Sequence, residues 1–224
     1  MSHPQLDLNA DELLSTTRAV RKRLDFDRPV DMTVIEECMN LAVQAPTGSN
    51  AQGWQFMFVT DADKRAQIGE YYRQAFSLYK DMPIAIHHLH QDSGDNALTA
   101  SQQRSASSAD YLAENMGRAP VLMIPCIAGR TDNEAGANAL AQTGTMGSII
   151  PAAWNFMLAA RARGLGTAWT TLHLMHEQAI AELLGIPYED YMQVALIPIA
   201  YTKGTDFKPA YRPPVQTVMH VNQW

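Results

Sequence analysis

The chain is predicted to fold as an α/β or α+β domain built on a small sheet, because apolar strand patterns alternate with helical patterns along its length. Its 224 residues suit one or two domains and can bury a sizeable core without metal or disulfide staples. Hydrophobic residues make up 46% and charged residues 18%, as in ordinary globular proteins, and we find no internal repeat. We therefore treat residues 1–224 as a single domain.

The first half of the chain predicts helices over 12–20, 32–45 and 62–79, with a strand over 54–59. Asp11 is the candidate cap of the first helix, after a polar N-terminal arm over 1–10. Asp31 is the candidate cap of the second helix. Residues 81–105 lack periodicity, and we expect a lid or insertion loop there.

The second half predicts helices over 108–116, 144–163 and 177–184, and strands over 121–128, 167–172 and 193–201. The helix over 144–163 is apolar on most sides, so we expect it in the core or at a subunit interface. Residues 202–224 are expected to form a C-terminal extension.

Charge and cysteine content exclude several functional classes. Acidic residues outnumber basic ones by 23 to 17, giving a net charge of −6, so the basic footprint of a nucleic-acid-binding protein is absent. Cys38 and Cys126 are too few for a disulfide framework or a zinc ribbon. We see no secretory signal and no apolar run long enough to span a membrane. We expect a cytoplasmic protein without a nucleic-acid or membrane partner.

Residues 18–23 form the first stretch that points to chemistry. Four of its six positions are cationic, namely Arg18, Arg21, Lys22 and Arg23. One interpretation is a solvated helix end, where cations complement the helix dipole. The other is a phosphate clamp, because arginine presents a planar fork of donors to phosphate oxygens.

Three further stretches are candidates for binding. Residues 46–54 place amides and hydroxyls before an apolar strand, which suits either a turn or recognition of a flat heterocycle. Residues 167–172 are rich in β-branched side chains and fit a plain strand. Residues 203–212 are basic and contain proline, so they form either a solvated extension or a second source of cations.

Several common motifs are missing from the sequence. It contains no G-x-S-x-G, no Walker A loop and no G-x-G-x-x-G, so a serine hydrolase and a Rossmann domain lack support. His87, His88 and His90 have no acidic or cysteine partner at a zinc spacing, and we expect no metal site.

In this order, the stretches resemble the FMN-dependent nitroreductase family. The family pattern has an early Arg-x-x-x-Lys, then Ala-Pro-(Ser or Thr)-x-x-Asn-x-Gln-x-Trp, a long helix ending in Gly-Leu-Gly-x-x-Trp, an apolar strand and a basic tail. These elements correspond here to residues 18–22, 45–54, 144–169, 194–201 and 203–212. The resemblance covers nearly the whole chain, although residues 82–107 match no motif.

The resemblance implies an α+β fold with a central, mostly antiparallel sheet flanked by helices. It implies an obligate homodimer with two FMN molecules at the interface, each touched by both subunits. The helix over 144–163 resembles the family's long dimer-core helix, and the C-terminal extension would wrap the partner.

The resemblance also implies a set of cofactor-binding residues. Arg18 and Arg212 resemble the phosphate clamp, with Lys208 as a further candidate, and Lys22 resembles the cation near the flavin pyrimidine. Val20 falls where the family often has serine and offers only its backbone. Residues that resemble contacts from the second subunit are Pro46, Thr47, Gly48, Asn50 and Gln52. Thr171 and Leu172 match the segment that faces flavin N5 and O4, although the family usually has Glu-Gly or Gly-Gly there.

The implied function is ping-pong hydride transfer from NAD(P)H, through flavin N5, to a nitroaromatic, a quinone or an activated alkene. The cofactor supplies the redox chemistry, so no catalytic side chain is expected. The alternatives on this fold are a flavin-binding sensor or storage protein and dehalogenase-like or flavin-fragmenting chemistry. A nucleic-acid module built on residues 18–23 is disfavoured by the net charge of −6.

Overall fold

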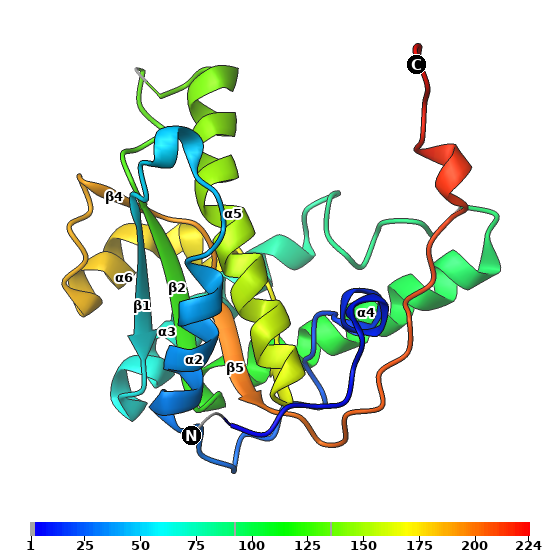
Figure 1. Cartoon of the computed structure of the whole chain (residues 1–224), viewed down its shortest axis with the longest axis horizontal. Helices are drawn as coiled ribbons and strands as arrows, with labels where there is room; N and C mark the ends of the chain where they lie inside the picture. Colours follow the sequence, from blue (N-terminus) through cyan, green and yellow to red (C-terminus); the bar gives the residue numbers. More distant parts are fainter. Residues whose placement is uncertain (1–2, 92, 135) are drawn as a thin grey trace.

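The computed structural model of the chain describes residues 3–91, 93–134 and 136–224, and its architecture is α+β (Figure 1). The central sheet has the strand order β1–β2–β5–β3, with β4 also paired to β2, and all these pairs are antiparallel. Its strands are β1 (Trp54–Val59), β2 (Val121–Ala128), β3 (Leu165–Thr167), β4 (Tyr191–Gln193) and β5 (Ile197–Tyr201). The predicted fold class is confirmed.

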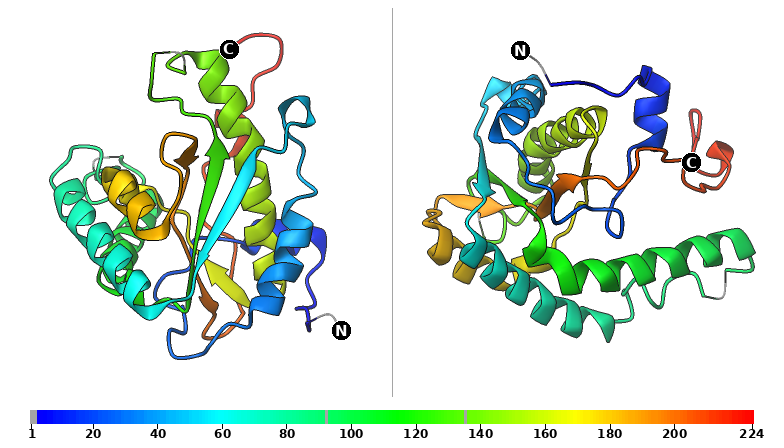
Figure 2. Two further views of the ribbon diagram at one scale, coloured as in Figure 1. Left: turned by 90° about the vertical axis from the view of Figure 1, so that its left-hand side faces the viewer. Right: turned by 90° about the horizontal axis from the view of Figure 1, so that it is seen from below.

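Helices cover both faces of the sheet (Figure 2). The helices are α1 (Ala10–Thr16), α2 (Met32–Ala42), α3 (Ala62–Lys80), α4 (Asn96–Asn115), α5 (Ala139–Ala162) and α6 (Glu177–Leu184). α2 and α5 lie on one face, and α3 and α6 lie on the other. Within the described ranges, no helix is both long and apolar enough to cross a bilayer.

β2 shows why the sheet holds two helical layers together. Val121 and Met123 pack with the α2 and α5 side chains, whereas Leu122 and Ile124 pack with the α3 and α6 side chains. Side chains alternate across a strand, so a continuous apolar run gives a strand that is buried on both faces.

The long helix α5 has two different halves. Its C-terminal half is buried around Phe156 and Met157, as predicted, but its N-terminal half extends beyond the sheet (Figure 1). Leu140, Ile150 and Trp154 are 86%, 42% and 38% exposed. Part of the apolar surface of α5 therefore has no cover within one chain.

The beginning of the chain corrects two predictions. Asn9, not Asp11, caps α1: its side chain accepts a hydrogen bond from the Glu12 N–H, and the Glu12 carboxylate accepts one from the Asn9 N–H. This reciprocal capping box starts the helix one residue before Asp11. α1 then ends at Thr16, so residues 18–23 are not a helix end.

The N-terminal arm is anchored on two helices. The Leu6 N–H donates to the Ala162 oxygen of α5, and the His3 N–H donates to the Glu37 carboxylate of α2. Met1 and Ser2 lie outside the described residues.

The predicted loop over 81–105 is half wrong. α4 begins at Asn96, where the Asp95 side chain accepts hydrogen bonds from the Ala97 and Leu98 N–H groups. The predicted helix over 108–116 is only the C-terminal part of α4. Serine, glutamine and alanine dominate the first half of α4, so no apolar stripe marked it in the sequence. Asp92, within the predicted loop, lies outside the described residues.

Two predicted strands also need correction. The strand over 167–172 ends at Thr167, and Thr170 makes only a single bridge to Leu196. The strand over 193–201 is divided into β4 and β5, which pair with β2 on either side of Pro125. Proline has no N–H to donate, so the ladder is interrupted there.

Candidate functional site

A cavity of about 860 Å³ opens where the N-terminal region, α4 and the C-terminal extension meet. We call it the cationic cavity. Its lining residues come from residues 14–21, the end of α3, the α3–α4 connection, α4, α5 and residues 209–212. Arg18, Arg21 and Arg212 are among them, and none of the described lining residues is acidic. Such a wall favours a ligand that carries negative charge.

The stretch over 18–23 is held beside β3 by its backbone. The Val20 N–H donates to the Thr167 oxygen at 2.8 Å, and Leu24 bridges Thr202 at the other end of the stretch. Val20 and Leu24 are buried, while Arg18 and Lys22 are exposed. A bridge to β3 followed by a hydrogen-bonded turn from Arg21 to Leu24 therefore exposes Arg18 and Lys22, without a helix.

The C-terminal extension brings a second group of cations to the same place. The Arg18 guanidinium donates to the Lys208 backbone oxygen at 2.7 Å, although the two residues are 190 positions apart. A smaller pocket of about 280 Å³ beside the cationic cavity is lined by Arg18, Val20, Lys22 and Lys208, together with others from 18–23 and 206–208. Five predicted site residues thus lie together, the fifth being Arg212 in the cationic cavity.

Arg21 is the site residue that the sequence reasoning missed. It lines both the cationic cavity and the smaller pocket, and its guanidinium donates to the Ser108 hydroxyl at 3.2 Å. Burial lowers the pKa of Arg21 from its usual range. Lys22, the predicted flavin contact, is exposed and donates to Ser107 at 2.8 Å. In the sequence, Arg21 was only one of four neighbouring cations, and nothing distinguished it from the others.

The predicted site residues within 46–52 do not lie at the cationic cavity. The turn lies against α5, where the Gly48 N–H donates to the Ser148 hydroxyl at 3.1 Å. None of the five predicted residues lines the cationic cavity or the smaller pocket: Pro46, Thr47, Gly48, Asn50 and Gln52. Ser49, Asn50 and Gln52 all have positive φ, at 53°, 53° and 49°. Left-handed backbone at non-glycine residues is strained, and such strain is concentrated at functional sites.

Thr171 and Leu172 follow the end of the predicted strand. Thr171 is exposed, Leu172 is half-buried, and a 3₁₀ turn begins at Leu172. Neither residue lines the cationic cavity. Tyr72 is buried, and this burial raises its pKa to about 12, while Thr170 and Arg21 both act to lower the pKa.

His173, next in the chain, is fully buried. Neither ring nitrogen has a hydrogen-bond partner among the described residues. Burial lowers the pKa of His173 to about 3, so the imidazole is neutral at physiological pH.

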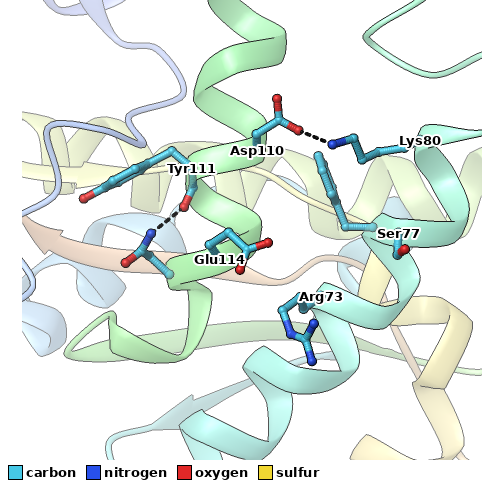
Figure 3. Close-up of a pocket in the computed structure, with 8 residues that line it drawn as sticks. Arg73, Ser77, Lys80, Asp110, Tyr111 and Glu114 are labelled. Carbon is cyan, nitrogen blue, oxygen red and sulfur yellow. Dashed lines mark hydrogen bonds and ion pairs between the residues drawn. The ribbon is translucent and has the colours of Figure 1, made fainter.

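A second pocket, of about 530 Å³, lies between α3 and α4 (Figure 3). Three of its four charged lining residues are paired within the chain, because Lys80 bonds Asp110 at 3.0 Å and Arg73 bonds Glu70 at 2.7 Å; the fourth is Glu114. Figure 3 shows Lys80 pointing at Asp110 rather than into open space. Because this pocket includes the carboxylates of Asp110 and Glu114, whereas the described lining of the cationic cavity has three arginines and no acidic residue, we assign the candidate site to the cationic cavity.

The chain belongs to the Nitroreductase family, whose sequence profile matches residues 14–201. The family resemblance inferred from the four sequence stretches is therefore confirmed.

Solved structures share this fold at low sequence identity. A BluB-like flavoprotein from Clostridium difficile 630 superposes with a TM-score of 0.70 at 17% identity, covering 96% of this chain and 100% of that one. An iodotyrosine deiodinase bound to FMN and 3-iodo-L-tyrosine gives 0.66 at 18% identity, covering 94% and 98%. An FMN- and NADPH-dependent nitroreductase from Sphingopyxis sp. strain HMH gives 0.66 at 18% identity, covering 97% and 100%.

Proposed function

We propose that the chain is an FMN-dependent oxidoreductase that acts as a homodimer. It would take hydride from NAD(P)H and deliver it to a nitroaromatic, a quinone or an activated alkene. The observation that supports this most directly is the cationic cavity, which has three arginines and no acidic residue among its described lining residues. Family membership and FMN-binding proteins of the same fold support it as well.

The cationic cavity fits the chemistry of FMN. Its volume of about 860 Å³ lies within the range of roughly 300–1,000 Å³ typical of cofactor pockets. Arg18 and Arg212 offer guanidinium forks for a phosphate. Ser101 and Gln102 offer hydroxyl and amide groups for a polyhydroxy chain, and Trp154 offers a flat apolar surface.

The chain's own residues would bind, orient and charge-stabilise the ligand. When bound, FMN would supply the hydride-transfer chemistry, and no side chain needs to act as nucleophile or base. Arg21 places a positive charge in a partly desolvated position, where it favours negative charge on a neighbouring group more strongly than it would in water. We assign this electrostatic role to Arg21, with the exposed Lys22 as a further positive charge in the smaller pocket.

A second copy of the chain would complete the site. Trp154 lines the cationic cavity and also belongs to the uncovered apolar surface of α5. The 46–52 turn lies against α5, so a partner seated on that surface would bring its own turn toward the cavity. This arrangement would give Asn50 and Gln52 a role that they do not have within one chain.

The visible spectrum of the purified protein tests the proposal. We expect about one FMN per chain, identified after denaturation, and bleaching by NAD(P)H without oxygen. A colourless protein that refuses added FMN would overturn the proposal. FMN that stays oxidised in NAD(P)H, or reduced FMN that no nitro, quinone or alkene acceptor reoxidises, would favour a sensor or storage role or dehalogenase-like or flavin-fragmenting chemistry.

A further inference from the structure

The C-terminal extension is fastened to the body of the protein by two arginines on one aromatic ring. Arg23 lies 4.2 Å and Arg161 lies 4.9 Å from the centre of the Phe207 ring. We infer that these three residues form a clamp that positions residues 203–212, and that the clamp thereby sets the affinity of the cationic cavity for a phosphate group. The second part of this inference rests on the proposed function.

Arg161 is held in an unusual position for a cation. It is 4% exposed at the end of α5, and it has no carboxylate within ion-pair distance among the described residues. Its Nη2 donates to the Thr205 oxygen at 3.0 Å and to the Thr16 hydroxyl at 3.3 Å, whereas Nε and Nη1 have no partner. Burial lowers the pKa of Arg161. Burying a cation without a carboxylate partner costs free energy, and the contacts of Arg161 with the C-terminal extension offset part of that cost.

Arg23, which belongs to the 18–23 stretch, contacts the same segment. Its Nε donates to the Lys203 oxygen at 2.8 Å, and its Nη2 pairs with the Asp206 carboxylate at 2.6 Å. Gly204 makes this approach possible, because its φ is +78° and an added Cβ would lie 2.6 Å from the Arg23 Nη2. Backbone, charge and ring contacts therefore converge on residues 203–207.

The clamped segment leads directly to the cations of the site. Lys208 follows Phe207, and its backbone oxygen accepts the hydrogen bond from Arg18. Arg212 lies four residues further on and lines the cationic cavity with Arg18. Residues 213–224 are exposed throughout. The clamp thus holds the chain directly before the segment that carries Lys208 and Arg212, and that segment has its own contacts at Lys208 with Arg18 and at Tyr211 with Asp95.

The test uses Phe207→Leu, which keeps apolar bulk but removes the ring, and Phe207→Tyr, which keeps the ring. Tyr188→Leu is the matched control, because Arg130 lies 4.0 Å over that half-buried ring, away from the extension. Arg161→Met is a second variant, accepted only if its melting temperature shows a folded protein. The first readout is amide hydrogen exchange over 202–214, which needs no ligand.

We expect faster exchange over 202–214 in Phe207→Leu and Arg161→Met, with wild-type exchange in Phe207→Tyr and Tyr188→Leu. Unchanged exchange in Phe207→Leu would overturn the clamp. The second readout is binding of FMN compared with riboflavin, which lacks the phosphate. We expect FMN binding to weaken about tenfold in Phe207→Leu and riboflavin binding to stay unchanged.

The two readouts separate the possible failures. Equal weakening of both flavins, or no weakening of either, would overturn the link from the clamp to phosphate affinity. If the wild-type protein binds neither flavin, the proposed function fails, and that link fails with it. The exchange result would still decide whether the clamp holds the extension.

Discussion

Residues 18–23 and the 46–52 turn carry the two parts of the proposed cofactor site, and they differ in how much of their surroundings one chain supplies. The 18–23 stretch is bonded to β3, to α4 and to the C-terminal extension, and its cations line the cationic cavity and the smaller pocket. The 46–52 turn is held mainly by its own hydrogen bonds and by Ser148, and its polar groups are largely exposed.

The difference indicates which part of the site is formed by folding and which needs assembly. Within one chain, the left-handed backbone of the turn is held by hydrogen bonds among Thr47, Asn50 and Gln52, and Asn50 and Gln52 stay exposed. They lie beside the α5 surface that has exposed Leu140 and Ile150. An apolar patch beside polar groups is typical of a protein–protein interface. We therefore expect the anion-binding part of the site to survive in a monomer and the remaining part to be lost.

The largest effect is expected from Ile150→Arg on α5. An arginine there would bury an unpaired charge in the proposed interface, which costs about 3–5 kcal/mol. We expect a monomer by light scattering and FMN binding weakened by at least about 100-fold.

Leu78→Arg is the control for this experiment, because Leu78 is 62% exposed, belongs to α3 rather than α5, and does not line the cationic cavity. Dimerisation and FMN binding should be normal in that variant. A dimeric Ile150→Arg protein with full FMN affinity would show that α5 is not the interface.

The next effect is expected from Arg18→Ala. Loss of a charge-assisted phosphate contact should weaken FMN binding by about 1.5–3 kcal/mol. Riboflavin binding should change little, and calorimetry can measure both. Arg73→Ala is the control, since Arg73 is an arginine already paired with Glu70. Equal FMN affinity in Arg18→Ala and wild type would mean that the phosphate lies elsewhere.

The sequence predicted the sheet better than it predicted the connections. β1 and β2 could be predicted because their apolar runs reflect burial on the sheet. The division of β4 from β5 depends on Pro125 of another strand, so it could not be predicted from residues 193–201 alone. The first half of α4 was missed because its cap and its polar helix carry no apolar period.

For the site, the sequence predicted the cationic residues but not their arrangement. Arg18 and Lys208 meet only because residues 203–207 fold back onto α5, a contact between distant parts of the chain. Arg21 and Lys22 could not be distinguished, because which of them is partly buried depends on the register of residues 18–23 against β3. Whether the 46–52 residues contact a cofactor stays a prediction.

A smaller, pH-dependent effect is expected from His173, beside the predicted Thr171 and Leu172. Burial lowers its pKa to about 3 in the folded protein, against an ordinary value of 6.5, so the unfolded state binds more protons between these values. Stability should be fully present above pH 6.5 and fall as the pH decreases toward 3. The loss by pH 5.5 is about 1.4 kcal/mol. His173→Phe should flatten this part of the pH profile in urea titrations, and an unchanged slope would contradict the assignment.

The smallest effect is expected at the wall of the cationic cavity formed by the α3–α4 connection. Ile86 lines that wall and is held on both sides, because its N–H donates to the Tyr79 hydroxyl and its oxygen accepts from Gln102. Ile86→Ala removes apolar surface but keeps these backbone bonds. We expect FMN affinity to stay the same and the kcat/KM ratio between a bulky and a small acceptor to change about three- to tenfold. Ile84→Ala is the control, since Ile84 is 68% exposed and does not line the cavity. Unchanged acceptor preference in Ile86→Ala would show that the α3–α4 connection does not select the acceptor. The proposed site would then consist of the arginine-lined walls and the 46–52 turn of a second copy.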